Sequence, residues 1–181
     1  MRQTLSALIF LFTATLVHAQ DLTDAEIQKW VKAYKAIIHW AETTNIEEEL
    51  DTKGEPTEYS SIFSQMMKHS ATSKHYDALV NVLDKNGYSN PDKWSETGDR
   101  IMMAYVANQM EGQEAEMKQQ LQQMKAMMDS GMIPPEQKAV MEQMLQESSK
   151  AMKAAAEAPA ADKQAVKRNQ VLLNSVMESG E

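Results

Sequence analysis

The sequence predicts an all-α protein of about six helices. An N-terminal helical group should occupy residues 20–88, and an extended antiparallel helical hairpin with a C-terminal helix should occupy residues 89–181. Two observations support this fold class. Apolar residues recur every three or four positions almost throughout, and the runs begin or end at helix-capping residues. No alternating run rich in β-branched residues is long enough to compete as a strand.

The first 19 residues have the layout of a secretory signal peptide. Arg2 supplies the positive start, Leu5–Val17 is an apolar run, and Val17-His18-Ala19 is a small-x-small cleavage site. The apolar run is shorter than the roughly 20 residues that a membrane-spanning helix needs. We therefore expect cleavage after Ala19, which leaves residues 20–181 as a single exported domain.

The composition limits the compartment and the classes of partner that the protein is expected to have. The chain has no cysteine, so we expect no disulfides, no thiol chemistry and no lipid attachment, which favours the periplasm. Without Arg2 the 17 basic side chains face 26 acidic ones, a net charge near −9. That charge argues against nucleic acid and anionic lipid surfaces as partners. No second long apolar run follows, so we expect no membrane insertion after cleavage.

The N-terminal helices are predicted from caps and apolar spacing. Thr23 and Glu26 form a capping box ahead of a long amphipathic helix, and a charged stretch, 47–58, interrupts the pattern. A short helix should carry Ile62, Phe63, Met66 and Met67. Ser73 should cap the next helix, which Asn86-Gly87 should close.

The predicted hairpin begins at Asn90-Pro91, an N-cap followed by proline at the first helical position. Its first helix would extend to Ser130, with Gly98 and Gly112 as the places where it should bend or break. Residues 131–135 would form the turn, the returning helix would end at Pro159, and a last helix would start at about Ala161.

Methionine is concentrated in the hairpin, where 11 of the 15 methionines fall between residues 102 and 152. An apolar seam repeats every seven residues, as in a coiled coil. Its members are Met103, Met110, Met117 and Met124, with Ala107, Leu121 and Met128 four residues beyond three of them. Three interpretations stay open: packing within the hairpin, binding of a protein partner by soft, adaptable side chains, and Cu(I) ligation by thioethers.

No catalytic constellation is visible. His39, His69 and His75 do not stand four residues apart, so there is no zinc-protease pair. Asp84-Lys85-Asn86-Gly87 does not match a calcium loop, since its position 12 is Ser95. There is also no nucleophile elbow and no phosphate-binding glycine loop. We therefore expect no enzyme, no cofactor and no metal site of the histidine or carboxylate type.

Residues 85–105 are the most distinctive segment. The Gly87-Tyr88 turn, Trp94, the Gly98-Asp99-Arg100 step and Tyr105 resemble a family of secreted, all-helical bacterial proteins of unknown function. The resemblance implies an exported helical fold and carries no activity. We group Trp94, Asp99, Arg100 and Tyr105 as structural residues or a possible clamp. Arg100 has two interpretations: a clamp for a carboxylate or phosphate, or a local ion pair that fixes the helix packing around Trp94, which we favour.

Together these features predict a periplasmic, non-enzymatic interaction protein, either chaperone-like or an adaptor, that binds a protein client or a second copy of itself. The expected contact residues surround the tip of the hairpin: Met124, Met127, Met128, Met132 and Ile133. The alternative is periplasmic Cu(I) binding by Met124, Met128 and Met132.

Overall fold

The computed structural model describes residues 21–44, 46, 59–130 and 134–177. Within these ranges every regular element is helical, so the all-α prediction is confirmed. The elements are α1 (Asp24–Thr44), the short 3-10 helix η1 (Tyr59–Ser61), α3 (Ile62–Ser70), α4 (Tyr76–Lys85), α5 (Pro91–Met110), α6 (Glu114–Asp129), α7 (Pro135–Glu157), α8 (Ala160–Arg168) and α9 (Gln170–Met177). The predicted signal peptide and the charged stretch 47–58 lie outside the described residues.

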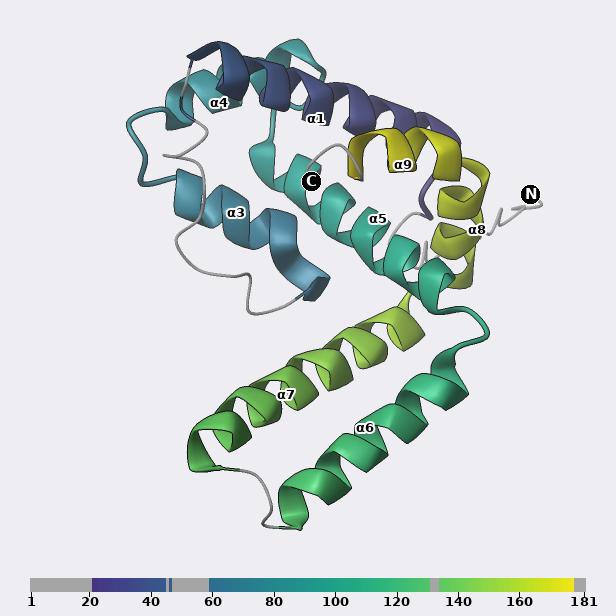
Figure 1. The fold of residues 1–181 in the computed structure, drawn as a ribbon. Coiled ribbons are helices and arrows are strands. Elements are labelled where there is room, and N and C mark those ends of the chain that lie inside the picture. The colour runs from purple at the N-terminus through teal and green to yellow at the C-terminus, as the bar shows by residue number, and fades with distance from the viewer. Residues whose placement is uncertain (1–20, 45, 47–58, 131–133, 178–181) are drawn as a thin grey trace, which may run out of the picture.

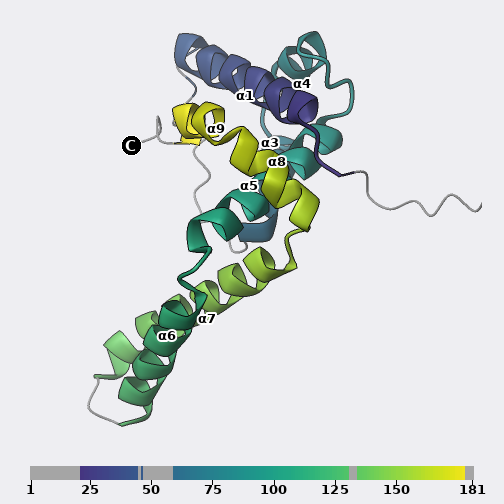
Figure 2. The ribbon, with the colours of Figure 1, turned by 90° about the vertical axis from the view of Figure 1, so that its right-hand side faces the viewer.

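Helix α5 is the centre of the molecule. It contacts α1, α3, α4, α8 and η1, and it also contacts α7 near the base of the hairpin. Figure 1 shows α1, α3, α4, α8 and α9 arranged around α5, while α6 and α7 extend together to one side. After a rotation of 90°, the same pair still points away from the other helices (Figure 2). The fold is therefore a helical body with a projecting two-helix arm.

The structure has eight α-helices in its described part, not about six, because two predicted helices are divided. Gly112 has a φ of +84°, a conformation that suits glycine and ends α5 before α6 begins. Near the C-terminus, Asn169 separates α8 from α9. The division at Gly112 matters most, because it allows the arm to leave the direction of α5.

Three of the four capping sites predicted between residues 23 and 91 agree with the structure. The Glu26 N–H donates to Thr23 Oγ1 at 3.2 Å and the Thr23 N–H donates to Glu26 Oε2 at 2.8 Å, a complete capping box. The Asp92 N–H donates to Asn90 Oδ1 at 2.9 Å. Gly87, at φ +89°, closes α4. Ser73 was the wrong cap, because its hydroxyl accepts from His75 N–H in a turn that precedes α4.

An aromatic cluster joins three helices inside the body. The rings of Trp30 in α1 and Trp94 in α5 stack with centroids 5.8 Å apart, and Phe63 of α3 meets both edge-on. The Trp30 Nε1–H also donates to the main-chain oxygen of Trp94 at 3.1 Å. Both tryptophans are fully buried. They are core anchors, as large aromatics on helix faces usually are.

Gly98 does not break α5, contrary to expectation, and its role is to allow close packing. A Cβ atom built there would lie 2.7 Å from Phe63 Cδ2 and 2.8 Å from Trp30 Nε1. These are atoms of rigid buried rings, so they have little room to move. The absence of a side chain at Gly98 is what lets α1 and α3 approach α5 at this point.

We expect Gly98→Ala to destabilise the protein by about 1–3 kcal/mol, the usual cost of overpacking a core. The sign of this change in the free energy of unfolding is informative, because alanine in place of glycine in a helix interior normally stabilises by about 1 kcal/mol. Urea unfolding followed by circular dichroism measures the difference. Gln109→Ala, an exposed change in the same helix, should leave the midpoint nearly unchanged. A stabilised Gly98→Ala protein would contradict the packing argument.

Candidate functional site

The arm formed by α6 and α7 is the part of the fold that the main core does not include. The core cluster draws its buried side chains from α1, α3, α4, α5, α8 and α9, and none of its described members lies in α6 or α7. Within the arm the two helices contact each other, and α7 additionally contacts α5 and η1. The arm is therefore held to the body at its base and is covered on one side only.

The methionine seam is divided at Gly112: Met103, Ala107 and Met110 lie in α5, and only its second half lies in the arm, on α6. Met117, Leu121 and Met124 of α6 are half-buried, and Met128 is buried with 6% of its surface exposed. Met141, Leu145 and Met152 of α7 are also half-buried. Two helices can cover only one face of each other, so most of the seam keeps part of its surface in water.

Three larger apolar side chains of the arm are more exposed than the seam itself. Met127 is 56% exposed, Val140 is 59% exposed and Met144 is 52% exposed. Single exposed apolar residues are ordinary on protein surfaces, but here three occur on one two-helix element. The predicted tip residues differ in exposure: Met124 is half-buried, Met127 is exposed and Met128 is buried. Met132 and Ile133 lie outside the described residues.

A hollow of about 290 Å³ lies near the base of the arm. Three thioethers line it, Met110 from α5, Met117 from α6 and Met144 from α7, together with Glu147, Ser148 and Ala151. The repeat of seven places Met110 and Met117 on one seam, but no pattern in the sequence predicts that Met144 of the returning helix joins them. Thioethers are soft ligands and also adaptable apolar surfaces.

The distinctive segment 85–105 forms part of the core. Trp94 lies in the aromatic cluster described above. Asp99 accepts hydrogen bonds at the start of α3, from the Phe63 N–H at 2.8 Å, the Ser64 N–H at 3.3 Å and the Ser64 hydroxyl. Burial raises the pKa of Asp99, and these three hydrogen bonds act in the opposite direction. Asp99 thus fixes α3 to α5 by satisfying free N–H groups of the first helical turn.

Arg100 pairs with Asp162 rather than with its neighbour Asp99. Its Nε and Nη2 atoms donate to the two carboxylate oxygens at 3.0 and 2.8 Å, the two-pronged geometry that arginine favours. Asp162 is fully buried and also accepts the Leu22 N–H at 2.9 Å. One carboxylate therefore joins α5, α8 and the residues before α1. The guanidinium edge that a ligand clamp would use is directed at Asp162.

Tyr105 contributes another link of the same kind, since its hydroxyl donates to Asn174 Oδ1 in α9 at 3.1 Å. The four residues that the sequence grouped as a possible clamp, Trp94, Asp99, Arg100 and Tyr105, thus contact different elements of the body. They do not converge on one cavity. Asp162, the partner of Arg100, had no signal in the sequence beyond its position near the start of a helix.

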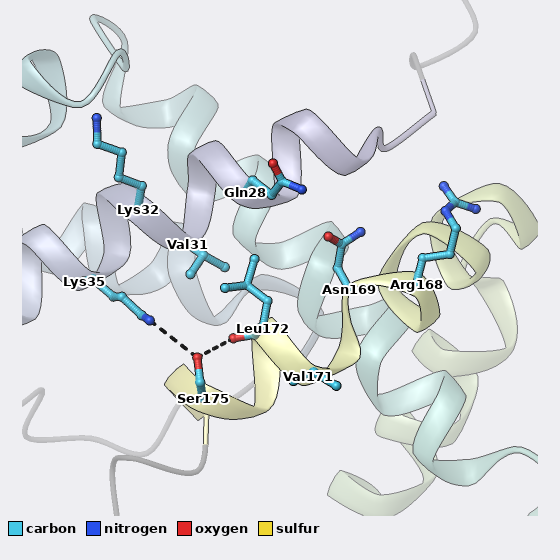
Figure 3. A pocket seen from close by; sticks show the side chains of 9 residues that line it. All are labelled: Gln28, Val31, Lys32, Lys35, Arg168, Asn169, Val171, Leu172 and Ser175. Carbon is cyan, nitrogen blue, oxygen red and sulfur yellow. Dashed lines mark hydrogen bonds between the residues drawn. The ribbon is translucent and has the colours of Figure 1, made fainter.

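A second surface feature lies at the other side of the body, between α1 and α9. This open groove, the α1–α9 groove, has a volume of about 790 Å³. Figure 3 shows its lining: Gln28, Val31, Lys32 and Lys35 from α1, and Arg168, Asn169, Val171, Leu172 and Ser175 from the end of α8 and from α9. No local pattern in the sequence predicts this groove, although the spacing of the lysines in α1 can be seen there.

One end of the groove is closed by an ion pair. Arg168 donates to Asp24 from Nε at 3.1 Å and from Nη2 at 2.9 Å, and Asn169 Nδ2 donates to the same carboxylate at 3.0 Å. The hydrogen bond from Arg168 lowers the pKa of Asp24. Further along, Lys35 Nζ lies 3.4 Å from Ser175 Oγ. These contacts show that α1 and α9 run in the same direction.

Two features are absent from the described part of the chain, and both bear on the class of site. No group of three histidine, cysteine or carboxylate side chains there is placed to hold a metal ion. Within the same residues, no helix is long and apolar enough to cross a membrane. Comparison of the chain with protein-family models, with curated proteins and with solved structures found no match in any of the three. The resemblance of residues 85–105 to a secreted family stays a prediction.

We expect Asp162→Ala to cost about 3 kcal/mol of stability, because removing one member of a buried ion pair leaves the other charge and a main-chain N–H unsatisfied. Arg100→Ala should also destabilise. The double variant should lose less than the sum of the two, a coupling that urea unfolding of all four proteins measures. Arg168→Ala breaks an ion pair whose side chains are 55% and 46% exposed, so its loss should be much smaller. Additive losses at Arg100 and Asp162 would contradict the assignment.

Proposed function

We propose that this protein is an exported, periplasmic, non-enzymatic interaction protein, chaperone-like or an adaptor, that holds a protein partner against the apolar, methionine-containing faces of the α6–α7 arm. The observation that carries the proposal is the arm itself. It projects from the helical body, and the apolar side chains between α6 and α7 stay partly exposed. Export rests on the signal-peptide pattern of residues 1–19.

The physical argument concerns the area that a partner would cover. A third apolar helix or an unfolded segment can pack where two helices leave their seam open. Burying the remaining exposed halves of Met127, Val140 and Met144 would contribute about 2–4 kcal/mol before the costs of ordering. That gain favours weak, reversible binding. Methionine suits varied partners, because its flexible side chain adapts to different shapes.

Charge also favours contact between the arm and other proteins. Residues 114–129 and 135–157 carry five basic and seven acidic side chains, so the arm has a net charge of −2 in a chain whose total is −8. A nearly neutral surface repels an approaching protein less than the rest of this acidic molecule does. The same feature allows a second copy of the arm to be the partner.

The test is whether the purified protein suppresses aggregation of a chemically denatured model enzyme, followed by light scattering. Replacing Met127, Val140 and Met144 together with glutamine should raise the protein concentration needed for protection at least about tenfold, since 1.4 kcal/mol of lost binding is a factor of ten. The fold should survive, because each of these side chains is more than half exposed.

The control replaces Ile38, an exposed apolar residue of the body outside the arm, with glutamine. This variant should protect as well as the wild-type protein. Equal loss in both variants would show that exposed apolar area in general, not the arm, causes protection. No protection by the wild-type protein, combined with no binding of a hydrophobic dye, would refute the proposed function.

Cu(I) binding stays the second candidate, and the hollow at the base of the arm favours it, because Met110, Met117 and Met144 line it together. Replacing these three with leucine should abolish Cu(I) uptake, measured by competition with a colorimetric Cu(I) chelator under reducing conditions. The set predicted from sequence, Met124, Met128 and Met132, gives the matched triple-leucine control. No measurable Cu(I) affinity of the wild-type protein would dismiss this candidate.

A further inference from the structure

The α1–α9 groove differs in charge from the rest of the molecule. Residues 27–41 and 163–177, which include all of its lining, contain six of the chain's 18 basic residues and none of its 26 acidic ones. Carboxylates from other segments pair with two of the six, Glu111 with Lys167 and Asp24 with Arg168. Two others, Lys32 and Lys35, are exposed along the groove and Arg168 lies at its end, where Asp24 pairs with it.

The groove has apolar surface beside these cations. Val31 is buried beneath it, and Leu172 is half-buried in its wall. Val171 is 88% exposed, more than any other large apolar side chain in the described part of the chain. Ile38, 42% exposed, lies one helical turn beyond Lys35 on α1. An apolar strip flanked by lysines is suited to a ligand that is apolar on one side and acidic on the other.

The shape of the groove favours one of three classes of such ligand: a small molecule, a lipid surface or a helix of another protein. Sites for small molecules usually enclose most of the ligand, whereas this groove is open along its length between two helices that run in the same direction. A flat lipid surface would contact ridges rather than a hollow between helices. A third helix packs into the space between two others, with its charged residues reaching the lysines at the edge.

We propose that the α1–α9 groove binds an acidic amphipathic helix of a partner protein. The apolar stripe of that helix packs on Val171 and Leu172, and its carboxylates pair with Lys32 and Lys35. This site lies at the end of the body away from the arm (Figure 1) and does not rest on the proposed function of the arm.

The probe is a fluorescein-labelled synthetic peptide of about 15–20 residues, enough to form a helix against a partner, with leucines on one face and glutamates on the other. Fluorescence anisotropy with the full protein should show binding that weakens as salt is added. Lys32→Gln with Lys35→Gln should weaken binding at least about tenfold. Val171→Asp should do the same, and the helix should tolerate this change because acidic residues favour the first turn.

The matched control is Lys68→Gln with Lys85→Gln, which removes the same charge from exposed lysines of α3 and α4 and should bind the peptide normally. The arm variant with glutamine at Met127, Val140 and Met144 should also bind it normally, which separates this site from the proposed function. A peptide with lysines in place of the glutamates should not bind.

Four outcomes would overturn the proposal. They are no binding of the acidic peptide up to about 1 mM, equal binding of the basic peptide, unchanged binding by the Lys32 and Lys35 variant, and preferential binding to phosphatidylglycerol vesicles. The last outcome would assign the cationic strip to a lipid surface.

Discussion

The close approach of three helices around Gly98 is the constraint on which the body depends. Trp30 from α1 and Phe63 from α3 occupy the space that a side chain at this position would fill. The hydrogen bond from Trp30 Nε1 to the main-chain oxygen of Trp94 then fixes the position of α1 along the axis of α5. Asp99, the next residue, holds the start of α3 in the same place. One turn of α5 thus positions both neighbouring helices.

The opposite side of the same turn secures the C-terminal helices. Arg100 is directed toward Asp162, whose carboxylate also receives the N–H of Leu22. A buried carboxylate would be costly if unpaired, so this arrangement is stable only while α5, α8 and the residues before α1 are all in place. The core cluster of the body has no described member in α6 or α7, and the arm contacts the body through α7, which packs against α5 and η1.

The two surfaces that emerge differ in chemistry. The arm offers soft apolar side chains with little net charge, whereas the α1–α9 groove offers an apolar strip beside the exposed lysines Lys32 and Lys35. The first suits varied apolar partners and the second suits a partner with acidic residues at set positions, because charge adds specificity more than affinity. Since they lie at opposite ends of the molecule, one partner need not exclude the other (Figures 1 and 2). Such an arrangement is what the proposed adaptor function requires.

The sequence by itself determined the all-helical character of the described chain and several of the helix caps. Thr23 with Glu26, Asn90 with Pro91, and Asn86 with Gly87 act through neighbours within a few residues, so local chemistry is enough to predict them. It also indicated the seam, because its repeat of seven is a property of one helix. Only the tertiary structure decided the contacts between residues that are far apart in the sequence. The sequence alone marks Gly98 as a potential helix break. Its role as a packing site appears only when Phe63 and Trp30, which are distant in sequence, lie against it. Arg100 pairs with a carboxylate 62 residues away, not with its neighbour. The groove exists only because α9 returns beside α1, and no local pattern specifies that return.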